Sequence, residues 1–153
     1  MKKKIMVMAA ALLAVLMLYV GCKKATDGDG SGNTVVVFTS SDENGTMTLY
    51  CYNDGTWVVH VKGVEEGVEM DLDMAAGTYT GNPAEDGECT VTTTKNVNIM
   101  GIFLATMMTG ENPEKITNTN APLQDVPAEE QKTETIIIVN GSFTLDGDTY
   151  TRK

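Results

Sequence analysis

The chain of 153 residues is poor in basic and in imidazole side chains, and both shortages restrict its function. It holds 11 lysines and arginines against 21 aspartates and glutamates, a net charge of −10. Because nucleic-acid binding depends on cations that neutralise phosphates, this acidity argues against a nucleic-acid partner. The single histidine, His60, lacks the companions that a zinc site or a Ser–His–Asp triad requires. We therefore expect no metal, no cofactor and no enzymatic activity, and we interpret His60 as a surface side chain.

The chain also lacks an apolar run of the roughly 20 residues needed to span a bilayer. Its longest such run, residues 5–20, follows three consecutive lysines and ends in the stretch LYVGCKK. A positive segment, a short apolar core and small residues at its end are typical of a secretory signal rather than a membrane helix. The pair Gly21–Cys22 resembles the bacterial lipobox, in which a small residue precedes a cysteine that is diacylated and becomes the mature N-terminus.

This resemblance implies that residues 1–21 are a lipoprotein signal peptide, cleaved between Gly21 and Cys22, and that Cys22 carries the lipid. An uncleaved anchor, or a conventional signal with a chance cysteine, are the alternatives. Residues 22–33 are rich in Gly and polar residues, and such chains behave as flexible coil. We expect them to tether a domain over residues 34–153 to a membrane of the bacterial cell envelope, at the outer membrane or cell surface rather than the inner membrane.

The charge of the remaining chain bears on how it meets that membrane. Without the leader, 8 basic residues face 21 acidic ones, a net charge of −13. Such a surface would repel anionic lipid, so the lipid on the tether is expected to make the membrane contact. Glu69, Asp71 and Asp73 share one face of a predicted strand, and we interpret them as a solvated face rather than a cation site.

Two cysteines lie in the predicted domain, Cys51 and Cys89. Export implies an oxidising compartment, where an even pair indicates a disulfide. A bridge between them would close a loop worth roughly 4 kcal/mol in the chain-entropy model. Two buried free thiols are the alternative.

From Asn33 onward the apolar residues recur with period two, which predicts strands. The clearest is VEMDLDM (68–74), in which apolar and acidic residues alternate strictly. Asn53-Asp54-Gly55 separates two alternating runs, 46–52 and 56–62, and an Asp-Gly pair in that place is a strong hairpin signal. One face of this hairpin is expected to carry Met47, Leu49, Cys51, Trp57, Val59 and Val61.

Seven to nine short antiparallel strands in sequence order predict an all-β domain, an up-and-down meander that closes into a small lipocalin-like barrel. The run 96–108 fits a buried strand or a short core helix, and we favour a strand. The segment 110–132 contains three prolines and predicts a long loop, with a helical turn at PAEEQ (127–131).

Two stretches resemble small lipocalin-like bacterial lipoproteins. GTYTGNPAEDGECTVTT (77–93) and FTLDGDTYTRK (143–153) are similar to strand pairs of that family, and the similarity covers roughly residues 46–94 and 134–153. The resemblance implies an up-and-down barrel with an apolar interior. It carries over no functional residue.

An unfilled barrel interior would hold an apolar ligand, and methionine is frequent on adaptable binding surfaces. The residues expected to line such a pocket are Trp57, Met70, Leu72, Met74, Met100 and Phe103. An ordinary packed core is the alternative. Two functions follow: a lipid-anchored module that binds a small apolar ligand, or a surface or periplasmic protein of the adhesion or antigen type that binds another protein and has no small ligand.

Overall fold

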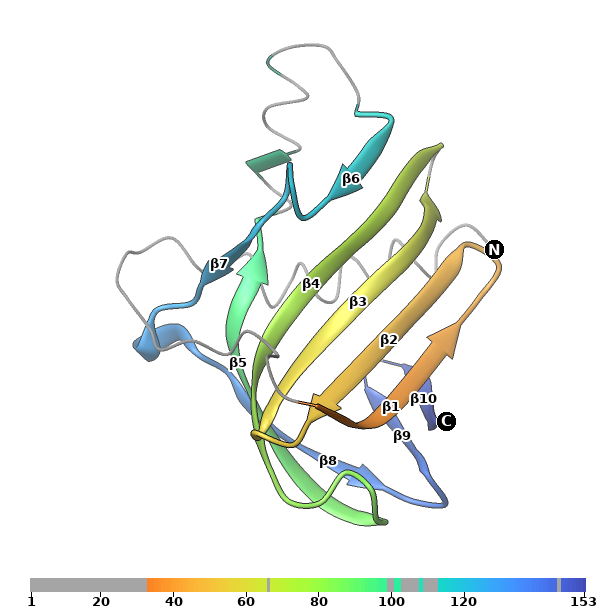
Figure 1. Cartoon of the computed structure of the whole chain (residues 1–153), viewed down its shortest axis with the longest axis vertical. Coiled ribbons are helices and arrows are strands. Elements are labelled where there is room, and N and C mark those ends of the chain that lie inside the picture. The colour runs from red at the N-terminus through yellow and green to blue at the C-terminus, as the bar shows by residue number, and fades with distance from the viewer. Residues whose placement is uncertain (1–32, 66, 99–100, 103–107, 109–112, 146) are drawn as a thin grey trace.

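A computed structural model describes residues 33–153 except 66, 99–100, 103–107, 109–112 and 146 (Figure 1). The predicted signal peptide and most of the tether, including Gly21 and Cys22, therefore lie outside the described residues, as do Met100 and Phe103. The described elements in chain order are β1 (Thr34–Ser41), β2 (Gly45–Tyr52), β3 (Thr56–Glu65), β4 (Val68–Thr80), β5 (Gly87–Val97), β6 (Lys115–Thr117), β7 (Leu123–Asp125), the 3₁₀ helix η1 (Ala128–Glu130), β8 (Thr133–Ile138), β9 (Ser142–Leu145) and β10 (Asp148–Arg152).

The predicted all-β fold is confirmed. The strands form one sheet with neighbours in the order β7-β5-β4-β3-β2-β1-β10-β9, and β8 also pairs with β5. Figure 1 shows this sheet curled into a half-barrel, with β8 and β9 approaching from its two ends. Among the described residues the only register pair between β8 and β9 is the bridge Val139↔Ser142. Backbone hydrogen bonds of 2.8 and 3.0 Å join these two residues. The eight strands β1–β5 and β8–β10 are here called the ring. The junction between β8 and β9, here called the seam, is weak because one bridge joins it among the described residues.

The predicted turns fall where the sequence places them. The amide of Gly55 donates to the carbonyl of Tyr52 at 3.2 Å and closes the β2–β3 hairpin. Asn140 and Gly141 have φ of +50° and +72°, the positive pair that a type I′ hairpin requires. The backbone amide of Gly141 also donates to Oδ1 of Asp86 at 2.9 Å. Asp86 thereby fastens the tip of the β8–β9 hairpin to the β4–β5 turn.

Two segments differ from the prediction. β5 ends at Val97, and Gly101 and Ile102 are helical, so the strand favoured over 96–108 holds for residues 96–97 and is wrong in the described residues beyond Val97. Asn98 explains the change, because its Oδ1 accepts the amide of Gly101 at 2.8 Å, as an N-cap side chain does. The predicted 110–132 loop contains the expected helical turn, η1, but also β6 and β7, and β6 pairs in parallel with β4.

Apolar side chains on the inner face form two clusters. The first draws on all eight strands of the ring and consists of Val36, Phe38, Leu49, Cys51, Trp57, Ala75, Cys89, Ile136, Ile138, Phe143 and Tyr150. Within it the ring of Phe143 stacks on Tyr150 and meets the edge of Phe38, with centroids 5.0 and 5.1 Å apart. The second cluster lies beneath β6 and β7 and consists of Leu72, Met74, Val97 and Ala121.

The pair Trp57–Gly77 sets how closely β3, β4 and β5 approach one another. The two residues are register partners on β3 and β4, and the β4–β5 register shifts beside Gly77. The indole Nε1 of Trp57 donates to the carbonyl of Thr78 at 3.0 Å. A Cβ at position 77 would collide with the carbonyl oxygen of Thr92 and lie 3.0 Å from Cε2 of Trp57. Only glycine lets the backbone of β5 and the indole approach β4 together.

Gly77→Ala is expected to lower the free energy of unfolding by about 3 kcal/mol, because overpacking that moves backbone costs this much. Gly67→Ala is the matched control: a Cβ there meets no atom within 4 Å, and only the φ of +87° opposes it. We expect about 1 kcal/mol at that site. Urea unfolding followed by far-UV circular dichroism measures both, and equal losses would contradict the collision.

Candidate functional site

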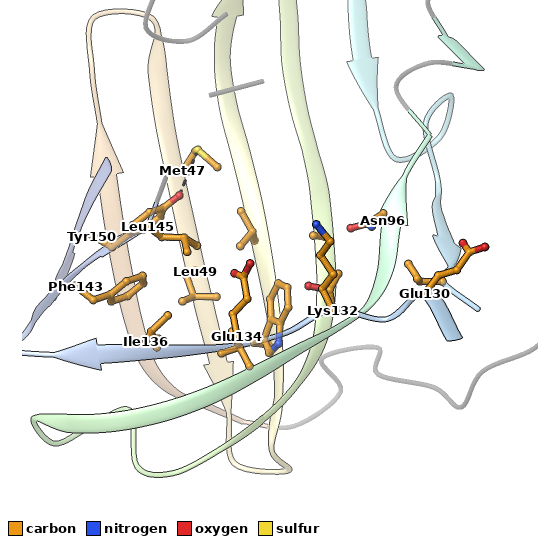
Figure 2. A pocket seen from close by; sticks show the side chains of 16 residues that line it. Met47, Leu49, Asn96, Glu130, Lys132, Glu134, Ile136, Phe143, Leu145 and Tyr150 are labelled. Carbon is orange, nitrogen blue, oxygen red and sulfur yellow. Dashed lines mark hydrogen bonds between the residues drawn. The ribbon is translucent and has the colours of Figure 1, made fainter. Parts of the chain in front are cut away.

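A cavity of about 130 Å³ lies inside the half-barrel. Side chains from seven strands form its apolar wall, as Figure 2 shows in part. These are Met47, Leu49, Trp57, Val59, Ala75, Val91, Ile136, Phe143, Leu145 and Tyr150, with Val126 from the β7–η1 connection. A dry engineered cavity of about 150 Å³ binds benzene, so this one has room for an apolar group close to the size of one aromatic ring.

Polar side chains gather at one end of the cavity, here called the polar end and formed by Asn96, Glu130 and Lys132, while Glu134 lies nearer the middle of the cavity (Figure 2). Figure 2 shows Asn96, Glu130 and Lys132 on the side away from the rings of Phe143 and Tyr150. Glu134 is exposed, and Lys132 is half-buried. The cavity therefore has an apolar, aromatic interior and reaches solvent beside charged groups, the arrangement of sites that bury a ligand body and orient its polar group.

The seam between β8 and β9 runs along this cavity. Glu134 and Ile136 line it from β8, and Phe143 and Leu145 line it from β9. These alternate residues point inward because successive side chains of a strand face opposite sides. Since the described part of the seam has one bridge, these two walls of the cavity are not held together by a hydrogen-bonded ladder.

Of the six predicted pocket residues, Trp57 lines the cavity. Met70, Leu72 and Met74 do not; they belong to the second cluster or pack against it. They share the inner side of the sheet, but they lie toward the start of β4, beside β6, where Ile102, Ile116 and Leu123 pack against the second cluster. The hairpin face predicted around Trp57 is confirmed, because Met47, Leu49 and Val59 also line the cavity. Met100 and Phe103 are outside the described residues.

The sequence reasoning missed the polar end and Glu134. Glu130 and Lys132 lie in the segment predicted as a loop, and Glu134 begins a predicted strand. The alternation of Lys132, Glu134 and Ile136 is a signal of one shared face. It becomes a cavity wall only because β8 pairs with β5, a long-range partner.

Cys51 and Cys89 are buried free thiols, 4% and 2% exposed, so the predicted disulfide is not formed in this structure. The strands that carry them, β2 and β5, are separated in the sheet by β3 and β4. Burial, with a smaller contribution from Cys89, raises the pKa of the Cys51 thiol to about 12. Burial also raises the pKa of Cys89 and of Tyr79.

Stability should therefore fall in alkali. The unfolded chain releases the Cys51 proton near pH 9 and the folded chain only near pH 12. The free energy of unfolding thus falls as pH rises through this window, by up to about 1.4 kcal/mol per pH unit for one thiol. Urea unfolding at pH 7, 9 and 10 measures the slope. Cys51→Ala should flatten it, and an unchanged slope in that variant would contradict the assignment.

The outer face of β3 and β4 carries a separate network of charges. His60 is 29% exposed and pairs through Nδ1 with Asp73 at 2.9 Å and through Nε2 with Asp71 at 3.1 Å. Lys115 of β6 pairs with Glu69 at 2.6 Å. A neutral imidazole has one N–H donor and a protonated imidazole has two. His60 therefore donates hydrogen bonds to both aspartates at once only when it is protonated. The acidic face is thus paired with His60 and Lys115, and the described residues contain no group of three His, Cys, Asp or Glu that could hold a metal ion.

Comparison of the chain with protein-family models, curated proteins and solved structures finds no match. The resemblance to lipocalin-like lipoproteins and to the lipobox therefore stays a prediction. Among the residues that the structure describes, no helix has the length and apolar character to cross a membrane.

Proposed function

We propose that this protein is a membrane-anchored lipoprotein of the bacterial cell envelope whose half-barrel binds a small ligand with an apolar body. The cavity is the observation that carries the proposal. Its wall is apolar, its volume suits one ring or a short chain, and its polar end meets solvent. A role in binding rather than catalysis fits this chemistry.

The apolar wall of the cavity supports a bound guest. Because the cavity opens to solvent, an apolar guest would remove apolar surface from water, which is favourable by roughly 25 cal/mol per Å². A ligand that binds only the folded domain raises its stability.

The N-terminal sequence supports the anchor. Gly21–Cys22 follows a short apolar run, and two acyl chains hold a protein on a membrane where one does not. The net charge of −13 beyond the leader keeps the domain itself away from anionic lipid. The tether then places the domain in the aqueous space beside the membrane.

A protein-interaction role is the second candidate. Ile137 and Val139 are 59% and 58% exposed and lie two residues apart, so they project from the same face at the end of β8. Two such side chains make a small apolar surface, well below the patches that mark interaction sites. The cavity is the larger feature, and it favours ligand binding.

Trp57 is the single tryptophan of the chain and lines the cavity, so its fluorescence reports occupancy. We expect ethylbenzene to change this signal in the full chain, reconstituted in phosphatidylcholine vesicles. Ala75→Leu adds three carbon atoms to the cavity wall, and it should weaken binding at least about tenfold without unfolding the domain. The matched control, Ala84→Leu, alters an exposed turn residue outside the cavity. Equal responses from both variants would place the probe elsewhere and reject the cavity as its site.

The anchor is tested by growing cells with an alkyne-bearing fatty acid and following the label on the protein. Wild-type protein should be labelled, and Cys22→Ser should abolish the label because the acyl-accepting thiol is gone. Cys51→Ala keeps that thiol and should stay labelled. Label on the Cys22→Ser protein would refute Cys22 as the site.

A further inference from the structure

We propose that the edge of β8 at the seam binds an extended segment of another polypeptide as an added strand, and that one aromatic side chain of this segment fills the cavity. The inference rests on the cavity of the proposed function and goes beyond it, because the apolar group in the cavity then belongs to a polypeptide. Three observations carry it: the backbone groups along the edge of β8, the exposure of its inward face, and the position of the cavity beside the seam.

Alternate residues of β8 direct their backbone groups into the seam. The amide of Thr93 on β5 donates to the carbonyl of Lys132 at 2.9 Å. Because bonded positions alternate along an antiparallel pair, every second residue of β8 after Lys132 bonds to β5. The amides and carbonyls of Thr133, Thr135 and Ile137 therefore point away from β5 and into the seam.

The ladder across the seam stops after one step. Val139 continues the same series and exchanges two backbone hydrogen bonds with Ser142. The next pair would be Ile137 with Thr144, and no backbone hydrogen bond joins these two described residues. Further along β8 the described strands supply no register partner on this side. Such an edge is the template to which an extended peptide adds as a strand, so its chemistry selects a polypeptide.

The inward face of β8 becomes more exposed with distance from the bridge. Ile138 is 1% exposed and Ile136 is 7% exposed, whereas Glu134 is exposed although it lines the cavity. These three side chains share one face because they alternate along the strand. The difference follows the divergence of β8 and β9 from their shared turn (Figure 1). The cavity therefore meets solvent along the diverging part of the seam.

A strand added to β8 would place alternate side chains in the cavity. Residues opposite each other on neighbouring strands share a face, so the side chain opposite Glu134 points inward. Glu134 lies near the middle of the cavity (Figure 2). The volume of about 130 Å³ has room for one ring there. The net charge of −13 beyond the leader repels an acidic segment. The partner is thus a neutral or basic extended segment with an aromatic residue at its centre.

A short peptide tests the added strand. In antiparallel register with β8, the two threonines of acetyl-ATFTAK-amide lie opposite Thr135 and Thr133, and its phenylalanine lies opposite Glu134. The peptide is titrated at pH 7 into the full chain in phosphatidylcholine nanodiscs by isothermal titration calorimetry, with empty nanodiscs as the blank. We expect it to bind at least about tenfold more tightly than acetyl-ATATAK-amide, because burial of the phenyl ring contributes this much.

Two N-methylated forms of the peptide test the backbone pairing. Methyl groups on both threonine amides block the hydrogen bonds to Thr135 and Thr133, and they should weaken binding at least about tenfold. Methyl groups on the amides of the phenylalanine and of the alanine after the second threonine point away from β8. This second form is the matched control, and its affinity should stay close to that of the parent peptide.

Variants of the protein test the same two contacts. Thr135→Pro removes one amide that faces the seam and keeps the bonds to β5, and an edge strand tolerates proline at such a position. It should weaken binding of the peptide. Ala75→Leu should reduce the advantage of phenylalanine over alanine in the peptide, and Ala84→Leu should leave it unchanged. Far-UV circular dichroism checks the fold, and the methylated peptides test the pairing if Thr135→Pro misfolds.

The outcomes separate this inference from the proposed function. If ethylbenzene binds in a way that Ala75→Leu weakens but the peptide does not bind, the cavity takes small ligands and the added strand is overturned. Equal binding of both methylated forms would also overturn it, because the peptide would then enter as an ordinary apolar ligand. A dimer of the full chain that Thr135→Pro dissociates would place a second copy on the edge and overturn a foreign segment. If the peptide binds as expected and ethylbenzene does not, the added strand stands and the small ligand fails.

Discussion

The contact between Trp57 and Gly77 is the constraint on which the rest of the structure depends. A meander of strands must bend to bury one face, and a sheet bends most easily where a side chain is missing. Gly77 supplies the gap on β4, and the indole from the partner position on β3 covers it and donates to Thr78. The same indole forms part of the cavity wall. Curvature and cavity therefore share one pair of residues.

Local signals predicted most of the fold. Period-two alternation located the strands, and the turn chemistry around Gly55 and Gly141 located two hairpins, because both depend only on neighbouring residues. Asn98 shows where this fails: an apolar run fits strand or helix, and a single capping contact decides between them. Met70 also lies on its predicted face, yet Ile102, Ile116 and Leu123 pack around that part of the sheet and Met70 does not line the cavity. No local pattern states which distant segment covers a strand.

The candidate site was predictable only in part, because local patterns place the faces of strands and not the pairing of distant segments. Trp57 and its hairpin face followed from alternation, so four of the eleven apolar wall residues were accessible to sequence reasoning. The polar side chains were not, because Lys132 and Glu134 reach the cavity through the pairing of β8 and the residue before it with β5, across more than 38 positions of chain. Cys51 and Cys89 show the same limit: the sequence left a disulfide and two buried free thiols open, and the structure has the free thiols, on strands separated by β3 and β4.

The single bridge between Val139 and Ser142 has a kinetic consequence. Most junctions in the ring are ladders that open only when several hydrogen bonds break together, but this junction costs two, each worth about 1 kcal/mol net. Asp86 holds the hairpin tip while the strands diverge beyond it, so β8 and β9 can swing apart about a fixed end. A sub-global opening at this junction costs far less than the free energy of unfolding. If the cavity binds a guest as proposed, the residence time of that guest and the stability of the fold depend on different bonds.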